Sequence, residues 1–442
     1  MSTYKYSLFD YHAIAKADIT IDGITVLAGD NGCGKSTLSR WLYYLVNTSS
    51  RYEELLFGEL KGQLDELLRQ GRSIVREISR PGREFNASDF LEISSNIQRV
   101  LFTDENAVQI VMQLFRDSVH LLGIGLIEYL SDTRSEYRIQ RMNRYLNLNI
   151  ERQEDFPTAI DGYVKGKLNE AETLLSEYNR DLEERTIERY FELLHSTYQV
   201  KDKEPERIQL SEDGVKLLRK NGLGNLLALE RAIYVDTPMA LSFGSVHSDS
   251  VFWQDLRRMI KSSSVPVSPS RLKLLIRIKN LIGGEVRVQD TIYQGKELRF
   301  IRKGDNLNIK LEDTATGMKT FAYIQKLIEN GFLNERTLLL IDEPEAHLHP
   351  KWIFEFAHLL VLLNKELGVK VMVASHNPDM VAAIQKVSQV EDMIDFTHFY
   401  QAYHQDEGYQ YVYRDLGGTV NEIFRSFNIA TSRIQDYGEQ SE

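Results

Sequence analysis

The stretch Gly29-Asp-Asn-Gly-Cys-Gly-Lys-Ser36 decides the fold of this chain. It matches the pattern Gly-x-x-x-x-Gly-Lys-Ser/Thr in full, and it follows an apolar run of strand type, Ile24–Ala28. A helical pattern begins at Ser36, with apolar residues at intervals of three and four. Glycines in such a turn let backbone N–H groups point toward an anion, and the helix N-terminus adds partial positive charge. The stretch therefore predicts a phosphate-binding loop.

The residue types in this loop predict separate tasks. The Lys35 ammonium is suited to the β- and γ-phosphates, and the Ser36 hydroxyl is suited to Mg²⁺. We interpret Cys33 as a small filler residue and not as a nucleophile. A chain of this length meets the pattern by chance roughly 1–2% of the time. The expected phosphate cradle comprises Gly29, Asn31, Gly32, Gly34, Lys35, Ser36 and Thr37.

Two acids follow a second apolar run near the other end of the chain. Leu338–Ile341 has the composition of a buried parallel strand, and Asp342 and Glu343 come directly after it. Because such strands deliver their carboxyl ends to the ligand crevice, we expect Asp342 to bind Mg²⁺ and Glu343 to act as general base. The alternative is a strand that ends in surface acids, which the phosphate loop makes less favourable.

A histidine follows the next apolar run. His376 comes directly after the strand pattern Val369–Ala374 and its Ser375. At this position it is expected to reach the γ-phosphate as a second catalytic residue. The alternative is a loop histidine without a role.

The pattern along the chain predicts an α/β fold with a mostly parallel sheet assembled from both chain ends. We expect residues 1–50 and 231–442 to form this split head, and residues 51–230 to form a mainly helical insertion. The clearest helix of the insertion runs from about Tyr163 to Leu194, with a break in its apolar seam at Arg185. Two interpretations stay open for it, a surface helix packed on a neighbour and a short coiled-coil arm.

Bulk composition narrows the class of protein. The chain has 442 residues, 42% of them hydrophobic, and a net charge of −11, so it can bury a core and carries no overall nucleic-acid-binding charge. The single cysteine excludes an internal disulfide. We find no secretory pattern and no apolar run of about 18 residues, and therefore expect a soluble cytoplasmic protein that does not contact a membrane.

Together these motifs resemble the ABC ATPase superfamily. Ile341-Asp-Glu-Pro-Glu-Ala-His-Leu-His-Pro350 and Ser375-His-Asn-Pro-Asp379 resemble the RecF-like, SMC-like and overcoming-lysogenization-defect ATPases. The resemblance covers roughly residues 4–47 and 282–414. It implies ATP and Mg²⁺ as ligands, ATP hydrolysis, and a homodimer or higher oligomer in which two subunits sandwich ATP.

The resemblance also implies a signature segment that closes over the ATP of the partner subunit. Here it is Thr314–Lys319, with Thr316 and Gly317 as the expected ATP contacts. Ala315 and Met318 depart from the family's usual serine and glutamine, and no Q-loop glutamine is identifiable. Asp236 is a weak candidate for that neighbourhood. Glu345, His347 and His349 have metal-like spacing, but the family pattern places them beside the dimer contact.

Three hypotheses on function follow. Roughly 65 residues after His376 leave little room for a nuclease domain. The chain thus resembles stand-alone ATPases that act with a separate effector, typically a nuclease, in antiviral systems such as Septu and the retron-associated pairs. This is the first hypothesis.

The second hypothesis is a DNA repair or maintenance ATPase with nucleic acid as ligand, and the third is a clamp that hydrolyses little ATP. The second hypothesis draws on two basic stripes, with solvated or ion-paired faces as the alternative: Arg134, Arg138, Arg141 and Arg144, and Arg271, Lys273, Arg277 and Lys279.

Overall fold

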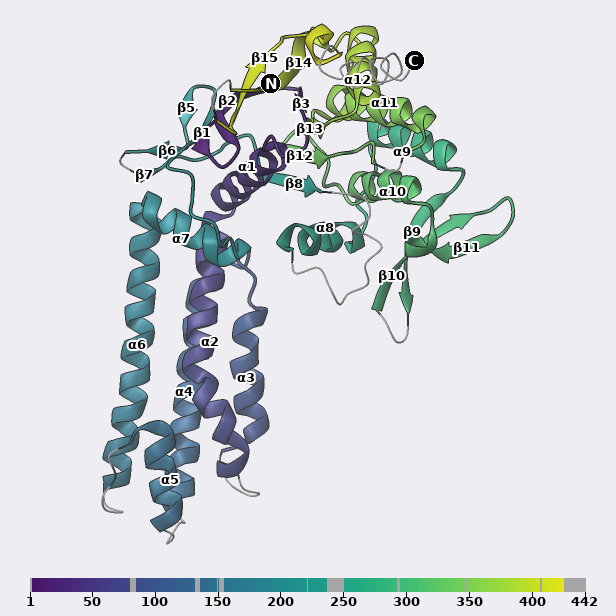
Figure 1. Cartoon of the computed structure of the whole chain (residues 1–442). Helices are drawn as coiled ribbons and strands as arrows, with labels where there is room; N and C mark the ends of the chain where they lie inside the picture. Colours follow the sequence, from purple (N-terminus) through teal and green to yellow (C-terminus); the bar gives the residue numbers. More distant parts are fainter. Residues whose placement is uncertain are drawn as a thin grey trace, which may run out of the picture. The chain divides into compact units, whose positions relative to one another are not determined.

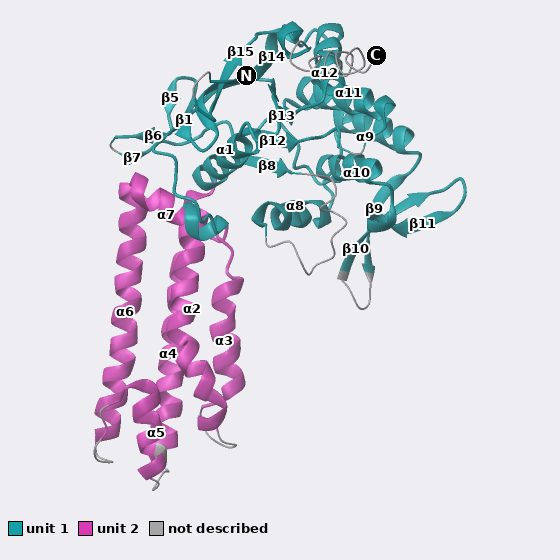
Figure 2. Cartoon of the chain, in the orientation of Figure 1, with its two compact units in different colours: residues 1–50, 194–442 teal, residues 51–193 magenta. Residues whose placement is uncertain are grey.

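A computed structural model describes residues 2–79, 85–131, 136–148, 150, 155–220, 222–236, 250–291, 295–346, 348–405 and 408–424. The chain forms two compact units, shown in different colours in Figure 2. Unit 1 comprises residues 1–50 and 194–442, and unit 2 comprises residues 51–193.

Unit 1 is built on a ten-stranded sheet whose strands come from both chain ends (Figure 1). The strand order is β5-β4-β1-β2-β15-β14-β3-β13-β12-β8. The strands are β1 (Tyr4–Tyr11), β2 (Ile14–Ile21), β3 (Ile24–Ala28), β4 (Arg207–Glu212), β5 (Val215–Lys216), β8 (Arg231–Val235), β12 (Thr337–Asp342), β13 (Lys370–Ser375), β14 (Thr397–His404) and β15 (Tyr411–Asp415). The predicted α/β class and the assembly of the sheet from both ends are confirmed.

The centre of this sheet is parallel. β14, β3, β13, β12 and β8 run in one direction, and every residue of β3, β12 and β13 is buried. Strands covered on both faces need continuous apolar sequence, which is why these segments read as unbroken apolar runs. The parallel direction brings the carboxyl ends of β3, β12 and β13 to the same edge of the sheet.

Helices cover the sheet of unit 1. α1 (Lys35–Ser50) buries Leu38, Leu42 and Leu45, so the predicted apolar stripe is confirmed. A smaller sheet, in the order β11-β10-β9, lies in the same unit. The remaining elements are α8 (Val251–Lys261), α9 (Pro269–Ile282), α10 (Thr316–Glu329), α11 (Pro350–Leu367), α12 (Pro378–Val390), β6 (Leu218–Arg219), β7 (Gly222–Leu223), β9 (Glu285–Thr291), β10 (Gly295–Arg302), β11 (Leu307–Lys310) and two 3₁₀ turns, η3 (Leu311–Asp313) and η4 (Ile394–Phe396).

Unit 2 is helical. Its elements are α2 (Tyr52–Ile78), α3 (Ala87–Arg99), α4 (Ala107–Ser131), α5 (Glu136–Leu146), α6 (Phe156–Glu184) and most of α7 (Ile187–Tyr198). α6 packs on α2 and α4 and ends at Arg185, whose φ of 45° is left-handed. In this structure α6 is therefore a helix packed on neighbours, and the expected helix to Leu194 is interrupted where its apolar seam breaks.

The boundary between the units differs from the sequence-based expectation. The insertion was expected to reach residue 230, whereas unit 2 ends at Leu193. The difference arises because β4 pairs with β1 of the large sheet, although β4 lies within the expected insertion. The local sequence of a short strand beside a helical region does not tell which sheet the strand joins.

One described helix, α4, is long and apolar enough to cross a membrane by length and composition. The expectation of no apolar run of about 18 residues did not single out this helix. Half of the apolar window is buried inside the structure, and α4 packs on α2, α3 and α6. These contacts are those of a core helix in a helical unit, which passes the same test.

Asn47 on α1 hydrogen-bonds backbone groups of β8, the strand at the edge of the sheet. Loss of this side chain is expected to destabilise unit 1. The buried Asn47 amide donates to the Ala232 carbonyl at 2.9 Å and accepts from the Ala232 N–H at 3.0 Å, where β8 ends the sheet. Asn47→Ala should lower the free energy of unfolding by about 2 kcal/mol, because two backbone groups lose their partner.

Tryptophan fluorescence during denaturation measures this effect, since Trp41, Trp253 and Trp352, the three tryptophans of the chain, all lie in unit 1. Asn421→Ala, at an exposed position of the same unit, is the control and should change stability by less than about 0.5 kcal/mol. Equal unfolding midpoints for the two variants would show that the hydrogen bonds of Asn47 to β8 do not stabilise unit 1.

Candidate nucleotide-binding site

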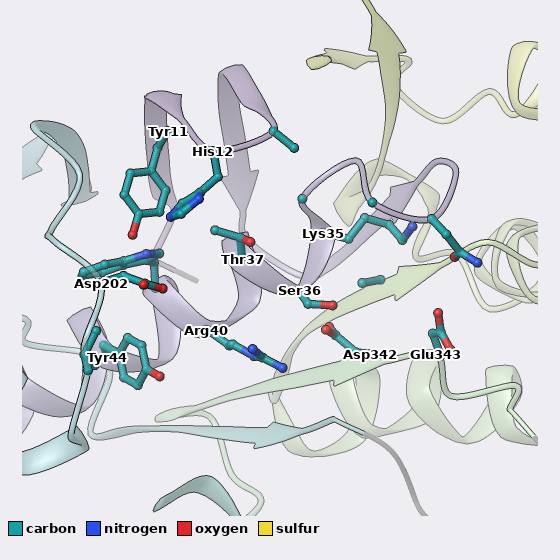
Figure 3. Close-up of a pocket in the computed structure, with 17 residues that line it drawn as sticks. Tyr11, His12, Lys35, Ser36, Thr37, Arg40, Tyr44, Asp202, Asp342 and Glu343 are labelled. Carbon is teal, nitrogen blue, oxygen red and sulfur yellow. The ribbon is translucent and has the colours of Figure 1, made fainter. Parts of the chain in front are cut away.

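A cavity of about 510 Å³ opens at the carboxyl edge of the parallel strands (Figure 3). One end is formed by the predicted loop and acids, and the other by side chains of the β1–β2 turn, α1 and the chain after α7. Its lining residues are Tyr11, His12, Ala13, Asn31, Gly32, Gly34, Lys35, Ser36, Thr37, Arg40, Trp41, Tyr44, Val200, Asp202, Asp342, Glu343 and Ala374. The volume suits a ligand of nucleotide size.

The loop backbone requires glycine at two positions. Gly32 and Gly34 have φ values of 84° and 96°, in the left-handed region that L-residues rarely adopt. A Cβ on Gly34 would also lie 2.6 Å from a side-chain carbon of Ile14. The Tyr413 hydroxyl donates to the Cys33 carbonyl at 3.1 Å and holds the turn from the far side. The loop is therefore fixed before a ligand binds.

Lys35 begins α1 and is buried within the loop. Its ammonium donates to the carbonyls of Gly29 and Asp30, both at 2.8 Å. Gly29 does not line the cavity directly, but it has room only for hydrogen, since a Cβ there would lie 2.8 Å from Ala402. The predicted cradle from Gly29 to Thr37 is thus brought together around one cavity end. Its contacts with phosphate remain a prediction.

Asp342 is a buried carboxylate surrounded by hydroxyl groups. Ser39 donates to its Oδ1 at 2.8 Å and Tyr234 donates to its Oδ2 at 2.9 Å, and Ser36 also bonds it. Burial raises the pKa of Asp342 above its ordinary value, and these three hydrogen bonds oppose that rise by stabilising the ionised form. Asp342 is only 2% exposed, so burial and these hydrogen bonds hold its carboxylate in one orientation.

These donors fit a magnesium ion. Mg²⁺ prefers oxygen ligands and is usually bound through one or two carboxylates together with substrate phosphates and water. Ser36 and Asp342 lie side by side in Figure 3 and supply one hydroxyl and one carboxylate. Within the described ranges no cluster of three or more His, Cys, Asp or Glu side chains forms a metal site, and His347 lies outside those ranges.

Glu343 occupies a different environment from its neighbour Asp342. Its side chain is 44% exposed and lies 3.3 Å from Nδ1 of His376. Its backbone has a φ of 48°, a strained region for a residue with a side chain, and its N–H donates to the Ala374 carbonyl at 2.8 Å. The predicted pair Glu343 and His376 is therefore brought together, although His376 itself does not line the cavity.

Glu345 lies beneath this pair. Ser375 donates to its Oε1 at 2.7 Å, and His376 Nδ1 lies 3.9 Å from the same oxygen. Burial raises the pKa of Glu345, and the hydrogen bond from Ser375 opposes the rise. His376 Nδ1 therefore lies between the carboxylates of Glu343 and Glu345.

The expected signature residues lie elsewhere. Thr316 and Gly317 begin α10 and are not among the described residues that line the cavity. Gly317 packs closely, since a Cβ there would lie 3.0 Å from the Trp352 ring and 3.2 Å from Leu348. Their contact with ATP remains a prediction.

Sequence reasoning missed the residues that support the site and those that form its second end. Ser39 follows Lys35 by one helical turn, and Tyr234 is a polar aromatic residue inside an apolar strand, so both carried a faint signal. No sequence signal marked Tyr11, Tyr44 and Asp202, because these residues come together only in the folded chain. Asp236, the weak candidate, lies 3.5 Å from the Arg40 guanidinium.

Comparison with known proteins identifies the class. The family described as "AAA domain, putative AbiEii toxin, Type IV TA system" matches residues 24–382. The chain belongs to this family of AAA-type ATPases.

Curated relatives match only in part. The chain is 36% identical over 72 residues to the energy-coupling factor transporter ATP-binding protein EcfA3 of Clostridium perfringens, covering 16% of this chain and 25% of that protein. It is 34% identical over 120 residues to the DNA replication and repair protein RecF of Arthrobacter sp. (strain FB24), covering 23% and 29%. The chain thus spans about a quarter of the length of these relatives.

Solved structures with a similar course of the chain include ATPase heads. The Smc head domain of Pyrococcus furiosus with an extended coiled coil, bound to the C-terminal domain of ScpA, has a TM-score of 0.34 at 12% identity, covering 98% of this chain and 99% of that chain. An ATP-binding cassette of an ABC transporter in its ADP conformation has a TM-score of 0.31 at 10% identity, covering 91% and 87%.

Glu343→Gln is expected to slow ATP hydrolysis by roughly 10²–10⁴-fold, because an amide cannot accept the proton of the attacking water. ATP binding should be retained, since the loop and Asp342 are unchanged. Phosphate release measures the first effect, and fluorescence titration with an ATP analogue measures the second. Glu335→Gln, at an exposed acid of the same unit, is the matched control. Equal turnover of Glu343→Gln and wild type would remove Glu343 from catalysis.

Proposed function

We propose that this chain is a nucleotide-gated sensor and scaffold whose ATP-bound dimer holds a separate effector protein, such as a nuclease, in antiviral defence. Lys35 and the loop hold the phosphates, Ser36 and Asp342 hold Mg²⁺, and Glu343 with His376 promotes hydrolysis. The bound Mg²⁺ would neutralise phosphate charge and orient the terminal phosphate. Hydrolysis then ends the state that holds the effector.

The position of the signature residues supports a dimer. Thr316 and Gly317 open the 14-residue helix α10, whose first N–H groups can receive an anion. They stand apart from the cavity of their own chain. A second copy placed with α10 over the cavity would complete the site. Assembly would thereby depend on ATP, as gating requires.

The helical unit supports a protein partner. Leu101 and Phe102, in the connection between α3 and α4, are 64% and 39% exposed, and Ile110 in the first turns of α4 is 40% exposed. Phe102 also packs on Phe57, with ring centroids 5.7 Å apart, so the exposed apolar group is held in place. Apolar side chains gathered at one connection favour a protein contact. The family description, which names a toxin and a toxin–antitoxin system, agrees with a partnered protein.

Affinity purification from the native host with ATP and Mg²⁺ tests this proposal. Glu343→Gln should recover a second protein in stoichiometric amount, because it binds ATP without consuming it, whereas Lys35→Ala should recover little. Adding Leu101→Glu to Glu343→Gln should reduce recovery by about tenfold or more, the effect of losing an anchor worth about 1.4 kcal/mol or more.

Leu227→Glu is the control for the added charge, because Leu227 is 77% exposed and lies in unit 1. If Glu343→Gln is recovered without any second protein, both with and without ATP, the sensor role is contradicted. Equal losses for Leu101→Glu and Leu227→Glu would place the partner on another surface.

A second candidate function, DNA maintenance, is supported by one cationic cavity. The sequence-based stripes give it little support, because Arg141 pairs with Glu77, Arg277 with Glu355 and Lys279 with Glu285, while Arg134 lies outside the described residues. A cavity of about 540 Å³ lies between α8, α9, α10 and the small sheet. Five cationic side chains line it, and three of them pair with its acids: Lys279 and Arg287 with Glu285, and Lys326 with Glu329. Lys261 and Lys296 add positive charge to the same lining, in a chain of net charge −11.

Charge reversal tests this candidate. The double variant Lys261→Glu/Lys296→Glu should weaken binding of a labelled single-stranded oligonucleotide and reduce the salt slope by about 1.4, at ~0.7 per phosphate neutralised. Fluorescence anisotropy at several salt concentrations measures both. Lys216→Glu/Lys386→Glu, at exposed positions of the same unit, carries the same change of charge and should leave the slope unchanged. Identical slopes for both doubles would exclude the cavity as a nucleic-acid site.

A further inference from the structure

Tyr234 joins the metal-binding carboxylate to the rest of unit 1 through a single buried hydroxyl group. It lies on β8, next to β12, in register with Leu340. Alternate residues of a strand share a face, so the side chain of Tyr234 reaches the same side of the sheet as that of Asp342. Its hydroxyl donates to Asp342 Oδ2 at 2.9 Å, and both side chains are almost completely buried.

The two oxygens of Asp342 are held from two different elements. Ser39 of α1 donates to Oδ1 at 2.8 Å, and Tyr234 of β8 donates to Oδ2. Hydrogen bonds to an ionised acceptor are about twice as strong as neutral ones. With Ser39 on one oxygen and Tyr234 on the other, the carboxylate plane is fixed while lone pairs remain for a cation.

The proton of the Tyr234 hydroxyl has a defined direction. The Arg40 guanidinium donates a hydrogen bond to the phenol oxygen. Because a guanidinium has no acceptor atom, the hydroxyl proton is directed to Asp342. Arg40 is itself held between Asp236, at 3.5 Å, and the ring of Phe252, 5.9 Å from its centroid. Arg40 therefore orients the hydroxyl without contacting the carboxylate.

Packing fixes the ring as well. Phe252 on α8 meets Tyr234 edge-on with centroids 4.9 Å apart, and Tyr43 on α1 lies at 6.4 Å. α8 is anchored in turn, because the buried Asn330 amide donates to the carbonyls of Met259 and Ile260 at its end. The ring therefore cannot leave Asp342 without moving α8.

We propose that Tyr234 is a positioning residue that orients Asp342 for the divalent cation. The proposal rests on the proposed role of Asp342 as a metal ligand. It assigns no contact with nucleotide to Tyr234, and its effect is confined to binding steps in which the cation takes part. Groups that orient metal ligands typically change metal affinity by 10–100-fold when they are removed.

Tyr234→Phe tests the proposal by removing one oxygen from an otherwise unchanged ring. The dissociation constant for Mg²⁺, measured calorimetrically on protein saturated with a non-hydrolysable ATP analogue, should rise roughly tenfold or more. Affinity for the same analogue in excess EDTA should stay at the wild-type value. An unchanged Mg²⁺ dissociation constant, or equal losses with and without Mg²⁺, would overturn the proposal.

Tyr43→Phe is a matched control. Tyr43 is also a buried tyrosine beside Phe252, and its hydroxyl donates to the carboxylate of Asp255 at 2.5 Å and not to Asp342. It should leave the Mg²⁺ dissociation constant unchanged. A rise as large as that of Tyr234→Phe would assign the effect to packing around Phe252.

Two further variants distinguish a failure of the metal role of Asp342 from a failure of the positioning role of Tyr234. Asp342→Asn should abolish the Mg²⁺ dependence, and if it does not, the proposed metal role of Asp342 fails. If Asp342→Asn loses Mg²⁺ binding but Tyr234→Phe keeps it, only the positioning role fails. Should Tyr234→Phe not fold, Phe252→Leu, which withdraws the packing behind the ring, must weaken Mg²⁺ binding in the same direction. Unchanged Mg²⁺ binding in a folded Phe252→Leu would then count against the proposal.

Discussion

The in-register pairing of β3, β13 and β12 is the constraint on which the rest of the structure depends. Ala28 is opposite Ser375, and Ala374 is opposite Asp342, so the three strands end at one level. Ser39 and Asp342 are 303 positions apart in the chain and yet share a hydrogen bond of 2.8 Å. A one-residue slip would turn Asp342 to the opposite face of the sheet, away from Ser39, so the register of these strands also fixes the site.

The same edge places two neighbouring acids in opposite environments. Asp342 is buried among hydroxyl groups, whereas Glu343 is 44% exposed, on a backbone turned into the left-handed region. Such a turn is strained, and it separates two side chains that a regular strand would already point to opposite faces. The arrangement gives one acid the fixed geometry that a cation needs and leaves the other free to meet water, as pairs of catalytic carboxylates with divergent environments do.

The sequence was informative where a local pattern carries the structure. The loop from Gly29 to Ser36, the acids Asp342 and Glu343, and His376 all stand directly after apolar runs, and the runs became the central strands. The boundary at Leu193 was not predictable, because β4 joins the sheet through pairing with β1, about 200 positions away. Tyr11, Tyr44 and Asp202 likewise meet only through long-range packing, which no local spacing encodes.

The short chain between Glu343 and α11 offers a direct physical route from the cavity to the signature helix. The Ala346 N–H donates to the Glu343 carbonyl at 3.0 Å, and the Leu348 N–H donates to the Glu345 carbonyl at 2.9 Å. Leu348 and Trp352 then pack closely on Gly317, where an added Cβ would lie 3.0 Å from the Trp352 ring. Because close-packed contacts transmit displacement, a movement of Glu343 would reach the start of α10 along this path. Under the proposed function, such a path would couple hydrolysis to assembly.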